Sequence, residues 1–223
     1  MKIKLISHSQ APMEDALHKH SALDLIAYCA RVSNPTNQNN TETNEKLVKY
    51  LMKHKHWSPL EMVSVCLEVE TTRDIARQLL RHRSFSFQEF SQRYADPTQD
   101  LDFEIREARL QDPKNRQNSI ATDDGLLQHG WADMQKKVID TALEAYNYAL
   151  SNGIAKEQAR AVLPEGNTLS RLYVNGTLRS WIHYIELRGA NGTQQEHMDI
   201  AHAVADVIAE IFPLAEEFKG KEI

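Results

Sequence analysis

The segment 81–93 concentrates side chains that bind anions. Its sequence, RHRSFSFQEFSQR, places three guanidinium groups, an imidazole, a carboxylate and several hydroxyls within thirteen residues. An arginine side chain stays charged and presents a planar fork of donors that matches the oxygens of a phosphate or carboxylate. The segment therefore predicts a site for an anionic ligand.

The charge of this region is opposite to that of the whole chain. Residues 73–93 hold five arginines against two acids and so carry +3, whereas the 223-residue chain carries −5. Proteins that bind duplex DNA usually spread lysines and arginines over a broad basic face. A local positive field in an acidic protein favours a compact phosphorylated molecule, and we expect no nucleic-acid partner.

A helix predicted over 72–81 leads into this segment. Apolar residues recur at helical spacing on one of its sides, and arginines recur every fourth residue on another, at positions 73, 77 and 81. Two interpretations of this basic face stay open. It belongs to the ligand site, or its arginines form ion pairs with acids elsewhere in the fold.

Length and composition allow one domain with a sizeable core. The chain has 223 residues and is 41% hydrophobic. No apolar run is long enough to span a membrane, and the N-terminal residues turn polar too soon for a secretory signal. Cys29 and Cys66 form no disulfide framework by their spacing. We expect a cytoplasmic protein with reduced cysteines and no membrane contact.

The hydrophobic pattern predicts a mixed α/β architecture. Strands are expected over 2–7, 62–70, 101–105 and 171–175, and helices over 21–31, 45–53, 72–81, 125–150, 156–163, 178–188 and 193–212. Ser21, Thr72, Thr177 and Thr193 are expected to cap helices, and Asn152-Gly153 to end the long one. Residues 95–124 lack sustained periodicity, which predicts a variable excursion from a single domain covering 1–223.

Other kinds of site have little support in the sequence. There is no GxGxxG or GxxxxGK[ST] motif, so the chain is neither a Rossmann dehydrogenase nor a P-loop enzyme. Ser91 lacks the flanking glycines of a hydrolase elbow, although His82 is near in sequence. His54, His56 and Glu61 do not have the spacing of a metal site, and we expect no metal.

Three further polar residues are expected to be structural. His197 and His202 lie on the last predicted helix, where we expect ordinary histidines in contact with solvent or an interface. Arg171 is expected to be an ion-pair partner within the predicted strand 171–175.

Four motifs, in order along the chain, resemble those of the flavin-dependent thymidylate synthases. The most specific of them is Arg81-His82-Arg83 followed, after seven residues, by Ser91 and Arg93. The others are HWSPLE at 56–61, QARAVLP at 158–164, and the block 178–188 with Gln194 and Glu196 after it. Together they span about residues 45–212, so the resemblance covers most of the chain.

The resemblance implies an activity and an assembly. Members of this family make dTMP from dUMP, with methylenetetrahydrofolate as the carbon donor and FAD reduced by NADPH as the hydride donor. They have an α/β fold, here expected to be of the α+β type with a central twisted sheet flanked by helices. They are homotetramers whose active sites are assembled from several chains.

The resemblance also implies which residues bind dUMP. Ser91, Arg93 and Arg160 match positions that hold its phosphate and sugar. Arg188, supplied by a neighbouring chain, matches a contact to the pyrimidine carbonyl side, where a guanidinium stabilises negative charge that develops on the ring. The full set of matched positions is Gln78, Arg81, Glu89, Ser91, Arg93, Arg160 and Arg188.

Further matched positions line FAD. These are His56, Ser58, Glu61, Arg81, His82, Arg83, Gln88, Glu89, Arg179 and His183. The resemblance implies that Arg188, Ser91 and His56 are the residues nearest the chemistry. At three positions the chain departs from the family: Gln88 replaces the usual Asn, and Thr177 and Gly192 stand where some members have Asn and His.

Two alternatives to this function stay open. The first is a non-catalytic nucleotide- or RNA-binding module, in which the aromatic residues of the basic segment 73–94 stack on bases. The second is a flavin-dependent nucleotide methylase that uses another base or another folate.

Overall fold

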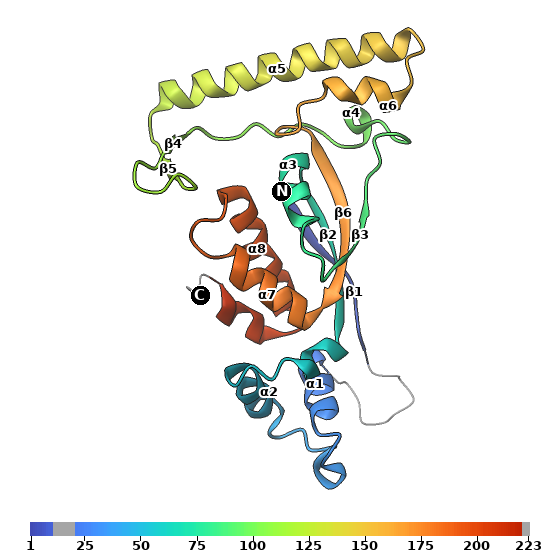
Figure 1. Cartoon of the computed structure of the whole chain (residues 1–223), viewed down its shortest axis with the longest axis vertical. Helices are drawn as coiled ribbons and strands as arrows, with labels where there is room; N and C mark the ends of the chain where they lie inside the picture. Colours follow the sequence, from blue (N-terminus) through green and yellow to red (C-terminus); the bar gives the residue numbers. More distant parts are fainter. Residues whose placement is uncertain (11–20, 220–223) are drawn as a thin grey trace.

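A four-stranded antiparallel sheet in the order β1-β2-β6-β3 forms the centre of the computed structural model, which describes residues 1–10 and 21–219 (Figure 1). The strands are β1 (Lys2–His8), β2 (Ser64–Thr72), β6 (Leu169–Thr177) and β3 (Ser86–Glu89). The predicted central sheet and mixed α/β class are thereby confirmed.

The long pairing of β2 with β6 sets the sheet. It runs without a break from the pair Ser64 and Thr177 to the pair Thr72 and Leu169. The side chains of Val65, Leu67 and Val69 alternate on its buried face, as the period of a strand requires. Opposite Glu70 lies Arg171, and the two form an ion pair of 2.9 Å, which confirms the structural role predicted for Arg171.

Helices surround this sheet at three places (Figure 1). α7 (Leu178–Arg188) and α8 (Gln195–Ala209) pack against it together with η4 (Pro213–Phe218). At one end lie α1 (Ala22–Ala30), η1 (Pro35–Asn37), α2 (Asn44–Lys53) and η2 (Ser58–Met62). At the other end lie α4 (Pro97–Asp100), α6 (Lys156–Ala159), η3 (Arg160–Val162) and the long α5 (Gly125–Ser151), while α3 (Arg73–Leu79) follows β2.

Two of the four predicted caps, Ser21 and Thr177, form side-chain cap bonds, whereas Thr72 precedes α3 without one. Ser21 forms a capping box with Asp24 at the start of α1, and the Thr177 side chain accepts a hydrogen bond from the Ser180 amide at the start of α7. α5 ends at Asn152, followed by Gly153 with φ of 76°. The prediction for Thr193 is wrong, because α8 begins after Gln194 and has no side-chain cap.

A buried aromatic side chain anchors the loop between α3 and β3 to the core. Phe85 is 7% exposed, and its ring lies 4.4 Å, between centroids, from that of the fully buried Trp181. The ring also lies directly on Gly176 of β6, where a Cβ would meet Phe85 Cδ1 at 2.3 Å. Only glycine allows this close approach. The loop 81–85 is therefore fixed to the sheet at its C-terminal end.

The strand predicted over 101–105 is wrong, because the segment pairs with the backbone of residues 167–169 at a single bridge only. The segment is extended, but Phe103 makes only an isolated bridge to Thr168. Further along the chain, the Gln135 side chain accepts from the backbone amide of Arg106 and donates to its carbonyl. The Gln128 side chain makes the same two bonds with the backbone of Ala108. Side chains thus take the place of a neighbouring strand.

Several short strands were missed by the hydrophobic pattern. β4 (Arg109–Gln111) and β5 (Ser119–Ala121) pair as a hairpin within the excursion 95–124. β3 lies inside segment 81–93, for which an anion site is predicted. The helix predicted over 156–163 is shorter, because α6 gives way to η3 at Arg160. No helix in residues 1–10 and 21–219 is long and apolar enough to cross a membrane. A single domain over 1–223 stays a prediction, since it includes residues outside those ranges.

We predict that Gly176→Ala destabilises the protein by roughly 1–3 kcal/mol, because a methyl group there must displace the Phe85 ring. Urea unfolding measures the change. Gly130→Ala is the matched control: Gly130 lies inside α5 with open space around it, and the substitution should stabilise the helix by about 1 kcal/mol. Equal stability of Gly176→Ala and wild type would contradict the anchoring role of Phe85.

Candidate functional site

The loop after α3 brings His82 against α7 and α8. The His82 ring lies edge-on to Tyr184, with 5.1 Å between centroids, and 6.2 Å from the ring of His197. Arg188, at the end of α7, donates from Nε to His82 Nε2 at 2.9 Å. We call these four residues the His82 cluster.

Burial and positive charge keep the imidazoles of this cluster neutral. Burial, with smaller contributions from Arg188 and Arg81, lowers the pKa of His82 to about 4. Burial, Arg188 and His82 lower the pKa of His197 to about 3. At neutral pH the Nε2 atom of His82 therefore carries a lone pair, which accepts the hydrogen bond from Arg188.

The expectation that His197 contacts solvent or an interface is wrong. Its side chain is fully buried, because it shares the core-facing side of α8 with Ile200, Ala201 and Val204. Its position, three residues before Ile200, was the available sequence signal. His202 is half-buried, and its Nε2 lies 3.2 Å from the Gly189 carbonyl.

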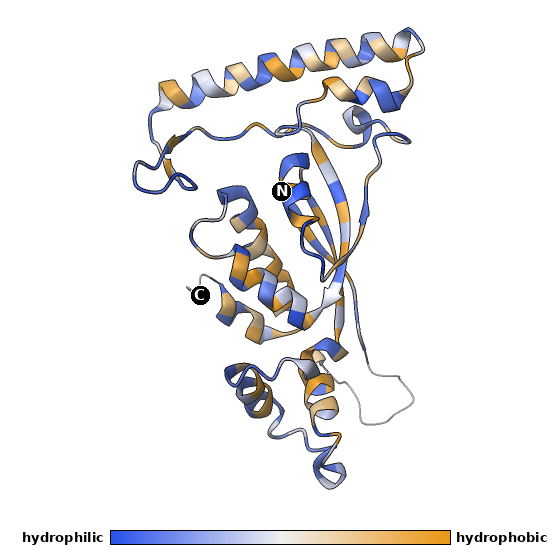
Figure 2. Ribbon diagram, in the orientation of Figure 1, coloured by the Kyte–Doolittle hydropathy of each residue, from blue (hydrophilic) through white to orange (hydrophobic). Residues whose placement is uncertain are grey.

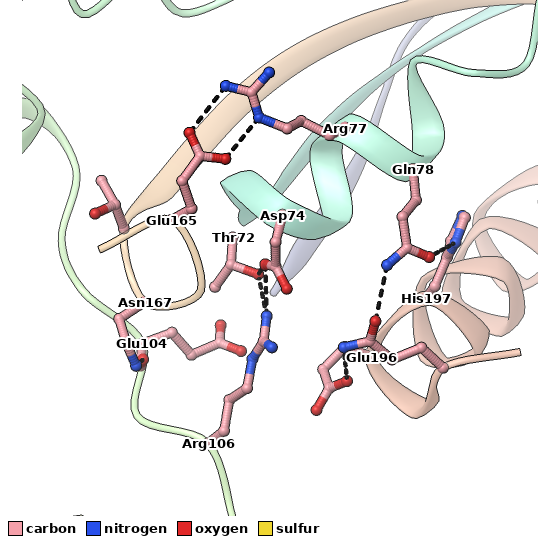
Figure 3. A network of polar contacts seen from close by, with 12 residues as sticks. Thr72, Asp74, Arg77, Gln78, Glu104, Arg106, Glu165, Asn167, Glu196 and His197 are labelled. Atoms are coloured by element: carbon pink, nitrogen blue, oxygen red, sulfur yellow. Dashed lines mark hydrogen bonds and ion pairs between the residues drawn. The ribbon is translucent and has the colours of Figure 1, made fainter. Parts of the chain in front are cut away.

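Gln78 extends from α3 toward the same place (Figure 3). Its Oε1 lies 3.2 Å from His197 Nδ1, and its Nε2 donates to Gln194 Oε1 at 2.8 Å. Three predicted site residues, Gln78, His82 and Arg188, are thus joined through a short network. Sequence reasoning missed His197, and it noted Gln194 only as part of a motif.

The arginines of the predicted basic face divide into two kinds. Arg77 makes a bidentate pair with Glu165, at 2.6 and 2.9 Å (Figure 3). Arg73 lies 3.4 Å from the same carboxylate. The Arg77 bond, more than any other contribution, lowers the pKa of Glu165. For these two residues the ion-pair interpretation is correct. Arg81 and Arg83 are exposed and form no ion pair within the described ranges.

A second group of predicted residues lies near α6. Ser91 and Arg93 follow β3, and Arg93 lies 3.5 Å from Glu157 of α6 with both side chains about half exposed. Arg160 is half-buried at the start of η3. We call Ser91, Arg93 and Arg160 the Arg93 group. Among the described residues, no hydrogen bond or ion pair joins this group to the His82 cluster.

Glu89 and Gln88 lie on β3 between these two groups. Glu89 accepts a hydrogen bond of 2.8 Å from Ser170 Oγ and lies 3.7 Å from Arg73. Gln88 is exposed.

A third group lies where η2 meets α7. Arg179 donates to Glu61 in an ion pair, and the ring of His183 lies 4.9 Å from that of Trp57. Burial, more than any other contribution, lowers the pKa of His183. His56 and Ser58 are exposed at the same place. No metal-binding group of three or more His, Cys, Asp or Glu occurs in the described part of the chain.

A polar cavity of about 330 Å³ separates the β4-β5 hairpin from the start of α8. Two arginines and several amide side chains line it, among them Arg109, Arg116, Asn118 and Gln194. Gly192 also lines it with φ of 92°, a conformation that residues with a Cβ rarely adopt. The glycine at this departure from the family pattern therefore has a backbone reason.

Comparisons with known proteins agree over most of the chain. Residues 16–214 match the family described as thymidylate synthase complementing protein. A probable flavin-dependent thymidylate synthase of Paramecium bursaria Chlorella virus 1 is 50% identical over 213 residues, which cover 96% of each chain. A flavin-dependent thymidylate synthase of a Synechocystis strain is 49% identical over 189 residues, which cover 85% of each chain.

A solved structure is similar in fold. The UMP/dUMP methylase PolB from Streptomyces cacaoi, bound with 5-Br dUMP, superposes with a TM-score of 0.79 at 27% identity. The match covers 97% of this chain and 93% of PolB. The similarity therefore includes the sheet, the surrounding helices and the excursion 95–124.

We predict that His197→Asn flattens the loss of stability in acid. The unfolded chain binds a proton at this histidine below pH 6.5, whereas the folded chain does not until about pH 3, so wild-type stability falls as pH falls between these values. Removing the imidazole should reduce that slope by up to about 1.4 kcal/mol per pH unit. Urea unfolding at several pH values measures it, and parallel curves for variant and wild type would refute the buried neutral state.

Proposed function

The chain belongs to the flavin-dependent thymidylate synthases, and from this membership we propose how its residues serve the methylation of dUMP to dTMP. We propose FAD as the flavin, methylenetetrahydrofolate as the carbon donor and NADPH as the reductant. FAD, when bound, supplies the hydride. The protein's own residues bind, orient and stabilise charge.

The observation that carries the proposal is the arrangement around His82. Arg81 and Arg83 are exposed without a carboxylate partner in the described ranges, next to a neutral His82 and beside Arg188. A guanidinium without an ion pair can turn toward a ligand without breaking a bond that stabilises the fold, and its donors match the oxygens of a pyrophosphate. This donor set fits FAD. His56, Ser58, Arg179 and His183 extend it along η2 and α7.

The Arg93 group fits the phosphate of dUMP. The pair between Arg93 and Glu157 is long and half exposed, and such pairs contribute little to stability. A phosphate dianion can therefore replace Glu157 as the partner of Arg93, with Arg160 and the Ser91 hydroxyl as further donors. We assign Ser91 to binding, because no described imidazole lies within hydrogen-bond distance of its hydroxyl to activate it.

Arg188 is suited to stabilise charge on the pyrimidine ring. His82 accepts only one of its N–H groups, from Nε, so the terminal nitrogens stay available to a carbonyl oxygen. A fixed donor at the atom where negative charge develops lowers the barrier more than it strengthens substrate binding. Gln78 and Glu89 complete the proposed dUMP contacts, and orientation against the flavin supplies further rate.

The exposed side of α5 supports a homotetramer. Leu127, Trp131, Met134 and Val138 recur at spacings of three or four residues, Tyr148 follows ten residues later, and each is 41–66% exposed. α5 crosses one end of the molecule, and its own chain covers one side of it, at α6, η3 and the extended segment (Figures 1 and 2). The stripe lies along the edge of that covered side, where Leu127, Trp131, Met134 and Val138 also line grooves with residues 106–111 and 166–167. Such a stripe is typical of a helix that packs on another helix.

The lack of a polar contact between the two groups supports the proposal that active sites are shared between chains. The His82 cluster and the Arg93 group have no direct contact through polar side chains in the described ranges, yet both are proposed to hold one dUMP. We propose that the Arg93 group of one chain faces Arg188 of another. The cytoplasmic location stays a prediction.

Purified protein tests the function directly. We expect a yellow protein with flavin absorbance that converts dUMP to dTMP when methylenetetrahydrofolate and NADPH are added. UMP is a second substrate to test, because the neighbour PolB is a UMP/dUMP methylase. A colourless protein that instead binds single-stranded RNA, with an affinity that falls steeply with salt, would support the binding-module alternative.

We predict that Arg93→Ala weakens dUMP binding roughly 10- to 100-fold, the loss of a charge-assisted hydrogen bond, and leaves FAD bound. Calorimetry measures the first and visible absorbance the second. Arg77→Ala is the control, because its guanidinium is occupied by Glu165. Unchanged dUMP affinity in Arg93→Ala would remove Arg93 from the site.

We predict that Met134→Glu combined with Val138→Glu dissociates the assembly, since both side chains lie in the exposed apolar stripe of α5. Light scattering measures the mass. Lys137→Glu changes charge on the same helix at an exposed residue that is already charged, and should leave the mass unchanged. A wild-type protein that is active as a monomer would contradict shared sites.

A further inference from the structure

Gln78 belongs to a chain of hydrogen bonds that begins at His197 and ends at the ion pair between Glu196 and Arg109. Gln78 Nε2 donates to Gln194 Oε1 at 2.8 Å, and Gln194 Nε2 donates to Glu196 Oε2 at 2.9 Å. The second carboxylate oxygen, Oε1, is bonded by Arg109 from the β4 strand. Residues of α3, α8 and the hairpin thus form one line.

The two amides in this line do not determine its direction by themselves. An amide group offers a donor on one side and an acceptor on the other, so turning both over preserves the bond between them. With both reversed, Gln78 would present its carbonyl to Gln194, and Gln194 would present its carbonyl to Glu196. The direction must therefore come from the ends of the chain.

The His197 end leaves the direction open. Its Nδ1 lies 3.2 Å from Gln78 Oε1, while its Nε2 is buried and has no hydrogen-bond partner in the described structure. A neutral imidazole carries its proton on either nitrogen. His197 can donate to Gln78 from Nδ1, or accept from it there with the proton moved to Nε2.

The Glu196 end does set the direction. An ionised carboxylate only accepts hydrogen bonds, and a guanidinium only donates them. Burial alone would raise the pKa of Glu196, but bonds from Arg109, from a backbone amide and from Gln194 outweigh it, and the pKa lies below its usual value. Glu196 must receive the NH2 of Gln194, which turns the Gln194 carbonyl to Gln78 and the Gln78 carbonyl to His197.

We propose that Arg109, Glu196 and Gln194 are positioning residues that fix which way the Gln78 amide faces in the dUMP site, with the Gln78 carbonyl accepting from His197 Nδ1. This inference rests on the proposed function for the role of Gln78, but the direction of the chain does not. A reversed Gln78 would offer an acceptor where dUMP meets a donor, and a donor where it meets an acceptor. The polarised chain removes that wrong state before the substrate arrives.

The proposal also gives the β4-β5 hairpin a role. Arg109 is the first residue of β4 and is held further by a bond of 2.9 Å from its Nε to Ser119 Oγ. The hairpin therefore supplies the cation that keeps Glu196 ionised in a half-buried position. Arg109 and Gln194 also form part of the wall of the polar cavity beside α8.

Glu196→Gln tests the proposal, because it keeps the size of the side chain while it removes the negative charge and gives the group a donor as well as an acceptor. Asp199→Asn is the matched control. It makes the same chemical change three residues further along α8. In the described structure the Asp199 carboxylate accepts a side-chain hydrogen bond from Gln195 and lies outside the chain of hydrogen bonds. Both variants are compared with wild type as the full-length, flavin-loaded protein.

Two readouts are needed. The first is the tautomer of His197, read from long-range 1H–15N spectra of protein labelled in its histidines, with His197→Asn used to assign the signal. We expect a proton on Nδ1 in wild type and Asp199→Asn, and a mixture or a proton on Nε2 in Glu196→Gln. The second is dUMP affinity by calorimetry, which should fall about tenfold in Glu196→Gln and stay unchanged in Asp199→Asn.

Each outcome is decisive. A proton on Nε2 of His197 in wild type, or an unchanged tautomer in Glu196→Gln, overturns the polarised chain. A changed tautomer with unchanged dUMP affinity overturns its positioning role. Wild-type protein that fails to bind dUMP would instead refute the proposed function, and the tautomer measurement would still decide whether the chain is polarised.

Discussion

The position of segment 81–93, the predicted anion site, depends on the pairing of β3 with β6. β3 is only four residues long and pairs through Ser86 and Glu89 with Asn175 and Leu172. Phe85, just before it, is pressed onto Gly176 of the same strand β6 and against Trp181 of α7. Because β6 also pairs along its whole length with β2, the segment is attached to a strand that is paired on both sides. His82 and Arg93 extend from opposite ends of this short anchor.

Charge around the segment is organised by which arginines have carboxylate partners. Arg77 and Arg73 share Glu165 and belong to the scaffold, whereas Arg81 and Arg83 are exposed, have no ion pair in the described ranges and are proposed to bind a ligand. Arg188 is held by a neutral imidazole, which orients it without neutralising its charge. A guanidinium that already donates two hydrogen bonds to a carboxylate, as Arg77 does to Glu165, has fewer donors left for a phosphate.

The sequence predicted what local periodicity and chemistry determine. The span of α5, the caps at Ser21 and Thr177, and the candidate residues of segment 81–93 follow from spacing, from helix-end chemistry or from the family motifs. Tertiary contacts determined what was missed. The segment 101–105 has a strand-like composition, but the backbone just beyond it bonds the side chains of Gln128 and Gln135, which no local pattern reveals. The burial of His197 and the link from Gln194 to Gln78 join residues more than a hundred positions apart.

The central claim is that one active site takes Arg93 from one chain and Arg188 from another. The most direct test is to mix Arg93→Ala and Arg188→Ala proteins under conditions where subunits exchange, at a dUMP concentration low enough that each variant alone has little activity. The account predicts recovery to roughly a quarter of wild-type dTMP formation, because one site in four then combines both intact arginines. If native mass spectrometry shows hybrid assemblies and activity stays at the level of the parents, both residues act within a single chain and the account is wrong.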